Sequence, residues 1–415
     1  MKKRSLIAAA AVLAAGPCLA QSSLTLFGVV DAGVSRYRTT SESYDPLRPG
    51  QLRQSQTVLS PSGNASSRLG FRGTEDLGGG LAVGFWLEAP LNNDTGGGIA
   101  NFGRRSTVSL SGPFGEVRLG RDYTASFWND AVFDPFIVNG VGTNLIAVVN
   151  SNIAASRALA TGGLLNGGLS AGTDSYLRTS NAVSYFLPPN LGGFYGQVQY
   201  ALHENTKVSN LPDSPSTRGR YVGGRMGWTN GPADVALAYG ESTLSSTAAL
   251  GEKIKSLNVG GSYDFGPVKV FGEWSRVRDV RDVRNSATAF PGGSLRLSDR
   301  YDGLMAGLNV PLGAGMIRAS YGRVRFVNGL DLPDGNASVN KLALGYVHNL
   351  SKRTALYASV ARIHIANGRN NPTVMGVTPL VLSLPAIFPQ PGYATTAGMQ
   401  PRSALGYDVG LRVSF

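Results

Sequence analysis

The chain alternates between apolar and polar residues over short segments from one end to the other. The last nine residues show this without a break, with Tyr407, Val409, Leu411, Val413 and Phe415 on one face and polar or small residues between them. Successive side chains of a β-strand point to opposite faces, so the segment predicts a strand with one apolar face. Such a strand fits a soluble sheet and a membrane barrel equally well.

Sixteen segments of this kind are separated by turn-forming or polar stretches. They span residues 24–38, 66–77, 81–89, 104–111, 116–122, 181–187, 194–202, 221–229, 233–241, 255–265, 268–278, 301–310, 316–326, 339–348, 354–365 and 402–415. Seven short links rich in Gly, Pro or Asn alternate with eight longer polar links. Short turns at one rim and long loops at the other are typical of an even-stranded transmembrane barrel, whereas a sandwich has no reason to segregate them. We therefore predict an all-β fold, a 16-stranded antiparallel transmembrane β-barrel with short periplasmic turns and long extracellular loops.

The N-terminus has the pattern of a cleaved export signal. Lys2, Lys3 and Arg4 precede an apolar run at residues 6–15, which is too short to cross a bilayer as a helix, and small residues precede a cut after Ala20. We expect residues 1–20 to be removed and residues 21–415 to form one barrel domain. The single cysteine lies in the removed part, so the mature chain contains no disulfide.

Charge and catalytic residue types narrow the function. The formal charge of +12 falls to +9 once Lys2, Lys3 and Arg4 are removed. Basic residues are dispersed and mixed with acids, which argues against nucleic acid as a partner. The three histidines of the chain stand in no catalytic or metal-ligand spacing. We expect no catalytic residues, no metal and no cofactor.

Four stretches and the terminal aromatic residue carry a family likeness. They are SLTLFGVVD at 23–31, SRLGFRGTEDLG at 67–78, FGEVRLGR at 114–121, LSKRT at 350–354, and Phe415. Together they resemble the general porins of Gram-negative outer membranes, especially the betaproteobacterial branch. The resemblance implies a homotrimer of water-filled barrels in the outer membrane bilayer, passed by small hydrophilic solutes and ions. It also implies a third loop folded into the pore, a second loop (90–103) that latches a neighbour, and Phe415 as the signal read during barrel assembly.

The link at residues 123–180 is too long for an ordinary connection in a compact protein, and an inward-folded constriction loop explains it. Whether its part at 140–172 forms a short helix or projects outward stays open. The resemblance places the acidic side of the constriction at Asp130 and Asp134, beside Pro135 and Phe136. The alternative is that both are solvated loop carboxylates.

Six arginines are candidates for a basic wall opposite this loop. Arg68, Arg72 and Arg318 alternate with apolar neighbours, and a charge facing lipid costs about 2–4 kcal/mol at mid-membrane, so these three should face inward. Of Arg104 and Arg105, only one is expected to face the lumen at mid-depth, and the resemblance favours Arg104. The resemblance adds Arg178, and Arg121 ends a strand at the base of the loop. For Arg104, Arg121 and Arg178 a solvated rim charge is the alternative.

An acidic loop facing a basic wall would set a transverse field across the pore. We predict passive diffusion of small hydrophilic solutes with a mild preference for anions, and no enzyme activity. A substrate-specific channel of the same fold is the nearest alternative. An outer-membrane enzyme or an adhesin fits the sequence less well.

Overall fold

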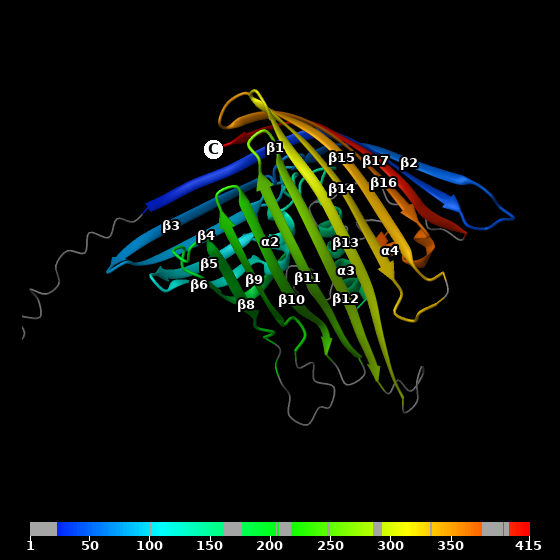
Figure 1. The fold of residues 1–415 in the computed structure, drawn as a ribbon, viewed down its shortest axis with the longest axis horizontal. Coiled ribbons are helices and arrows are strands. Elements are labelled where there is room, and N and C mark those ends of the chain that lie inside the picture. Colours follow the sequence, from blue (N-terminus) through cyan, green and yellow to red (C-terminus); the bar gives the residue numbers. More distant parts are fainter. Residues whose placement is uncertain are drawn as a thin grey trace, which may run out of the picture.

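The computed structural model describes residues 23–99, 101–160, 176–204, 206, 217–246, 250–284, 293–332, 334–375, 393 and 398–415. The predicted export signal at residues 1–20 lies outside these ranges. Seventeen strands run through the described residues and belong to one antiparallel sheet (Figure 1). They are β1 (Ser23–Ser43), β2 (Gln51–Pro61), β3 (Arg68–Gly78), β4 (Leu81–Pro90), β5 (Arg105–Gly112), β6 (Gly115–Tyr123), β7 (Arg178–Phe186), β8 (Phe194–Ala201), β9 (Tyr221–Asn230), β10 (Ala233–Ser246), β11 (Leu250–Asp264), β12 (Lys269–Arg284), β13 (Ser294–Leu312), β14 (Gly315–Val327), β15 (Ala337–Asn349), β16 (Thr354–Ala366) and β17 (Met399–Ser414).

Sixteen of these strands close into a barrel, as predicted. From β3 to β17 each strand pairs with the strand that follows it in the sequence, so neighbouring strands are linked directly by one turn or loop. The last strand then returns to the first, with Val29 opposite Ser414 and Ser43 opposite Met399. The other edge of β1 pairs with β3, from Ser23 opposite Thr74 to Val29 opposite Arg68.

The seventeenth strand, β2, was not predicted. It pairs with the outer half of β1, from Ala32 opposite Pro61 to Glu42 opposite Gln51, and forms a hairpin that projects from the barrel (Figure 1). We expected a plain loop here. Its run Gln51–Thr57 is exposed on both faces and polar except for Leu52, so it lacks the apolar alternation that a lipid-facing strand requires.

Several strands also extend further toward the loops than predicted. The pair β10 and β11 leaves only residues 247–249 between its strands, where a loop at 242–254 was expected. Similarly, β12 reaches Arg284 and β13 begins at Ser294. Outside the bilayer both strand faces contact water, so the apolar signal ends before the hydrogen-bonded ladder does.

The two faces of the barrel follow the predicted alternation. On β17, Val409 is 61% exposed on the outer surface, whereas the neighbouring Asp408 is 1% exposed on the inner side. On β8, Phe194, Val198 and Tyr200 are exposed in the same way. The outer surface of the spanning region is therefore apolar, and the polar positions line the interior.

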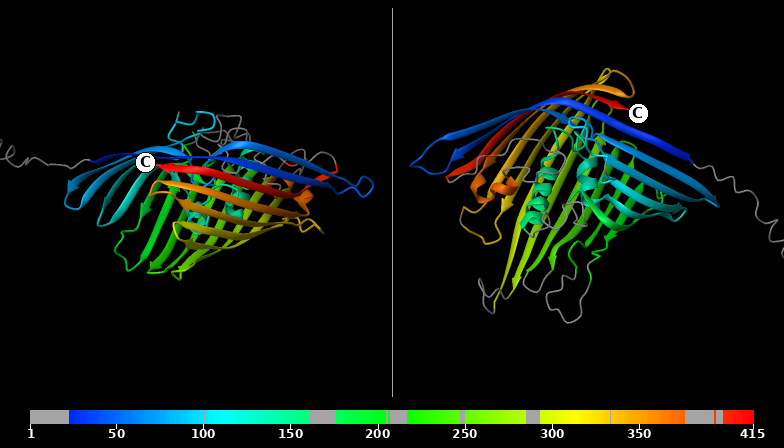
Figure 2. Two further views of the ribbon diagram at one scale, coloured as in Figure 1. Left: turned by 90° about the horizontal axis from the view of Figure 1, so that it is seen from above. Right: turned by 180° about the vertical axis from the view of Figure 1, so that it is seen from behind.

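The link between β6 and β7, called loop 3 below, folds into the barrel (Figure 2). It contains α2 (Ala125–Val132), which packs on β9–β11, and α3 (Leu145–Ala160), which packs on β12–β14. Gly322 and Gly303 permit the close approach of α3, because a Cβ at these positions would lie 2.9 Å from Leu145 and 2.7 Å from Ile146. The sequence left open whether residues 140–172 form a short helix or project outward. Residues 145–160 form the helix α3 inside the barrel, and residues 161–175 lie outside the described residues.

Two short helical segments follow β16. They are the 3-10 helix η1 (Gly368–Asn370) and α4 (Pro372–Met375), which packs against α3. None of the helices in the described part of the chain is long and apolar enough to cross a membrane.

Candidate functional site

The inner faces of β3–β7 carry six arginines that are tied together by carboxylates and aromatic rings. We call Arg68, Arg72, Arg104, Arg105, Arg118 and Arg178 the arginine cluster. Strand register places them side by side, since Glu88 on β4 lies opposite Arg105 on β5 and Arg178 on β7 lies opposite Tyr123 on β6. The cluster therefore forms one continuous wall of the lumen.

Three carboxylates hold part of this charge. Glu88 accepts from Arg104 at 2.5 Å and lies 3.8 Å from Arg68. Asp122 pairs with Arg118 at 2.6 Å and with Arg105 at 3.6 Å. Both carboxylate oxygens of Glu116 accept from Arg118, one from Nε at 3.0 Å and the other from Nη2 at 2.9 Å. With six arginines and three carboxylates, the wall keeps a surplus of three positive charges.

Aromatic rings fix the guanidinium groups in place. Arg105 stacks over Trp86 with 4.4 Å to the ring centroid, and Arg178 lies 4.5 Å from the Tyr123 ring. The Tyr123 hydroxyl accepts hydrogen bonds from both Arg104, at 3.2 Å, and Arg178, at 3.0 Å. Planar guanidinium groups bind aromatic faces and acceptors at the same time, so the cluster keeps its charge at defined positions.

The members of the cluster differ in how far they reach into the lumen. Arg72, which lies over Phe27 and Trp86, is exposed, and the Arg68 side chain is 30% exposed. Arg104 and Arg178 are largely covered by their partners. Arg68 and Arg72 are thus the members most open to a passing solute.

The remaining predicted arginines lie elsewhere. Arg318 on β14 faces inward as expected, but it is buried and donates to Asn64 Oδ1 at 3.0 Å rather than joining the cluster. Arg121 was wrongly placed on the wall. In the β5–β6 register Arg121 lies opposite Ser106, two residues from the exposed Leu119, so the alternation of β6 puts it on the outer face. It donates to the Gly103 carbonyl and to Ser180 Oγ, both at 2.7 Å.

Only one of Arg104 and Arg105 was expected to face the lumen at mid-depth, yet both contact the inner wall. Arg104 precedes the first residue of β5, so strand alternation does not apply to it, and both side chains reach inner-wall carboxylates. Sequence reasoning missed Arg118, Glu88 and Asp122 as members of the site. The even spacing of Glu116, Arg118 and Asp122, which puts them on one strand face, was the signal that could have found Arg118 and Asp122. On the neighbouring β4, Glu88 alternates with the apolar Leu87 and Ala89.

The two acidic residues of loop 3 are buried, at 0% exposure for Asp130 and 1% for Asp134. Asp130 accepts a hydrogen bond from Asn258 on β11. Burial, together with the adjacent Glu273 carboxyl of β12, raises the pKa of Asp130 well above its usual range. Neither side chain lies at an open surface. Asp130 and Asp134 are therefore neither carboxylates exposed at the constriction nor solvated loop acids.

Asp134 organises the tip of loop 3. Its carboxylate accepts from the backbone N–H groups of Phe136 at 3.0 Å, Val138 at 2.8 Å and Asn144 at 2.9 Å. Burial raises the pKa of Asp134, although these three N–H groups and Lys341 favour its charged form. Its role in the structure is to fold the tip.

Two inner-wall residues hold the tip in place across the lumen. Asp408 on β17 accepts from Val141 N at 2.6 Å, and Lys341 on β15 donates to the Thr143 carbonyl at 2.5 Å. Ser66 also donates to Asn139 Oδ1 at 2.9 Å. The tip of loop 3 is therefore attached to β15, to β17 and to the segment just before β3.

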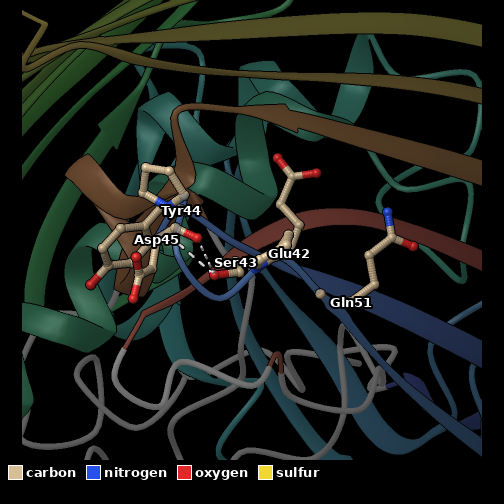
Figure 3. A pocket seen from close by; sticks show the side chains of 8 residues that line it. Glu42, Ser43, Tyr44, Asp45 and Gln51 are labelled. Carbon is tan, nitrogen blue, oxygen red and sulfur yellow. Dashed lines mark hydrogen bonds between the residues drawn. The ribbon is translucent and has the colours of Figure 1, made fainter.

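A separate pocket lies at the tip of the β1–β2 hairpin (Figure 3). It is lined by residues 42–46 and 49–51, among which Ser43 and Asp45 bond to each other. None of the arginine cluster lines it. Among the described residues, no group of His, Cys, Asp or Glu is arranged to hold a metal ion.

A closed barrel with an apolar outer face, an inward loop and a charged inner wall defines a channel protein of the outer-membrane type. The model of the family described as "Gram-negative porin" matches residues 7–368. The chain belongs to this family. It is an outer-membrane porin, and hence a channel rather than an enzyme.

Relatives agree with this assignment. The chain is 36% identical over 362 residues to "Outer membrane porin protein 32" of Delftia acidovorans, covering 86% of this chain and 89% of that protein. It is 29% identical over 392 residues to an outer membrane porin protein of Bordetella pertussis, covering 86% of this chain and 93% of that protein. Among solved structures, "Anion-selective porin from Comamonas acidovorans" matches with a TM-score of 0.70 and 32% identity, covering 95% of this chain and 100% of that chain.

Proposed function

We propose that the porin passes small hydrophilic solutes and ions by passive diffusion, with a preference for anions. The observation that carries the proposal is the arginine cluster, whose positive charge exceeds that of its carboxylates by three. Selectivity in a channel depends on the diameter and the charges of its narrowest part. A wall with excess positive charge lowers the free energy of an anion beside it.

The placement of the loop 3 acids supports the same preference. Asp130 and Asp134 are buried against other protein groups, so they present no open carboxylate to oppose the cluster. The related Comamonas acidovorans porin, at 32% identity, is described as anion-selective. We infer that the preference arises from Arg68 and Arg72 in particular, since they are the most exposed members of the cluster.

The zero-current potential across a planar bilayer under a potassium chloride gradient tests the proposal. An anion-preferring pore gives a zero-current potential of the same sign as the chloride equilibrium potential. A zero-current potential of the same sign as the potassium equilibrium potential would contradict the proposal.

We also propose that the protein assembles as a homotrimer. Strands β3–β8 are 8–11 residues long, whereas β10–β17 are 13–19 residues long, so one side of the barrel is low. The low side exposes apolar residues such as Phe85, Val108 and Leu119, which suit a contact between subunits. Three equal closing steps in single-channel records would support trimers, and single steps only would contradict them.

A further inference from the structure

The outer face of β12–β14 carries a second group of arginines that the channel function does not use. Arg276 and Arg278 on β12, Arg300 on β13, and Arg323 and Arg325 on β14 form what we call the outer arginine patch. Register places Arg278 opposite Arg300, and Asp302 between Arg276 and Arg325. Arg323 lies opposite Leu304, which is 59% exposed on the lipid-facing surface, so the patch points away from the lumen.

The patch has an unbalanced charge. Asp302 pairs with Arg276 at 2.7 Å and with Arg300 at 3.0 Å. Within the described part of the chain, no ion pair is found for Arg278, Arg323 or Arg325, and all three are exposed. Like charges on directly opposed strand positions repel, as for Arg278 and Arg300. Five cations around one carboxylate thus form a surface that an external anion would stabilise.

The height of the patch places it at the boundary of the bilayer. Arg323 lies eight residues beyond the short turn that ends at Gly315. At about 3.4 Å per residue and a tilt of about 40°, this is roughly 20 Å above the turn, close to the upper edge of an apolar band about 25 Å tall.

Aromatic residues mark the same boundary. Tyr321 precedes Arg323 by two residues and Trp274 precedes Arg276 by two, each on the outer face. The Arg276 guanidinium lies 5.4 Å from the Trp274 ring. Trp and Tyr gather at membrane interfaces, so the arginines just beyond them lie at the level of the lipid headgroups on the loop side.

We propose that the outer arginine patch binds the phosphate groups of lipids in the outer leaflet. Guanidinium groups bind phosphate oxygens through two parallel hydrogen bonds, and the patch offers several in adjacent rows. The adjoining apolar surface, with Leu304 beside Arg323 and Tyr321 nearer the short turn, would contact the acyl chains of the same lipid. This continuity favours a lipid over free phosphate.

The test measures binding of diphosphorylated lipid A to the purified, folded protein in detergent, by native mass spectrometry. The test variant is R323Q/R325Q. The matched control, K352Q/R353Q, removes two exposed cations from the turn at the opposite rim. We expect R323Q/R325Q to bind about tenfold more weakly or worse, because charge-assisted bonds are lost, and the control to bind as the wild type does. Equal binding by R323Q/R325Q and the wild type would overturn the proposal.

Two further arms use only the wild-type protein, so they stand even if R323Q/R325Q does not fold. Lipid A stripped of its phosphates should bind about tenfold more weakly than the diphosphorylated form. Equal binding of both forms would overturn the proposal, because the acyl chains alone would then account for it. Complete displacement of lipid A by millimolar inorganic phosphate would also overturn it, by identifying a free-anion site.

Discussion

Asp408 on the last strand accepts a 2.6 Å hydrogen bond from the backbone N–H of Val141 at the tip of loop 3. The same carboxylate accepts from Ser35 Oγ on β1 at 2.6 Å. A single side chain therefore joins the strand pair that closes the barrel to the loop that crosses its lumen. The dimensions of the channel depend on this junction because the loop tip occupies part of the cross-section.

We predict that D408A releases the loop tip. The variant loses a buried carboxyl group that accepts from Val141 N, from Ser35 Oγ and, at 3.5 Å, from the Tyr37 hydroxyl. This loss should cost about 1–3 kcal/mol. Single-channel records should show more frequent flickering while the zero-current potential stays anion-preferring. D408N keeps an oxygen acceptor at the same place and should flicker less often than D408A. Equal flickering in D408N and D408A would indicate that the charge of Asp408, not its hydrogen bond, holds the loop tip.

The buried Asp130 predicts a pH dependence of loop attachment. Its pKa is raised above the usual value of 3.8, so the folded protein binds its proton more tightly than the unfolded chain does. The stabilising contribution is complete below pH 3.8 and is lost as the pH rises through the raised pKa. Heat-induced unfolding followed across pH should show this decline in the wild type.

The D130N variant is the matched comparison, since it mimics the neutral side chain and still meets Asn258. Its unfolding temperature should be less dependent on pH than that of the wild type. Identical pH profiles for the two proteins would show that Asp130 does not titrate in the folded state.

Tyr123 separates structural from electrostatic roles within the arginine cluster. Y123F removes the acceptor shared by Arg104 and Arg178 without changing any charge. We expect a loss of about 1–3 kcal/mol in stability, measured by urea unfolding, and an unaltered ion preference. Y321F on the outer face is the control and should lose less. A large shift in ion preference for Y123F would mean that the detailed positions of these arginines, and not their charge, set selectivity.

Much of the barrel was predictable because its signal repeats in every strand. The alternation of Val409 with Asp408, for example, reflects lipid on one side and lumen on the other. The signal fails beyond the bilayer, where the first seven residues of β2 are polar except for Leu52. Local pattern also could not show that β1 has three partners, since pairing between distant segments depends on the closed ring.

The candidate site was predictable only in part. Arg68 and Arg72 followed from alternation, and both lie on the inner wall. Asp130 was expected at the constriction, yet it is buried because α2 packs its polar side against Asn258 and Glu273, which lie more than a hundred residues further along the chain. Arg121 was misassigned because it was chosen for its closeness to loop 3 in the sequence. Closeness to a loop does not determine whether a strand residue points into the barrel or out of it.

The most direct test of the central claim compares zero-current potentials for the wild type, R68Q/R72Q and R323Q/R325Q under a potassium chloride gradient. The last variant removes the same number of cations from the outer face, so it controls for net charge. We predict that R68Q/R72Q loses most of the anion preference while R323Q/R325Q keeps it. An unchanged preference in R68Q/R72Q would contradict the assignment of selectivity to the arginine cluster.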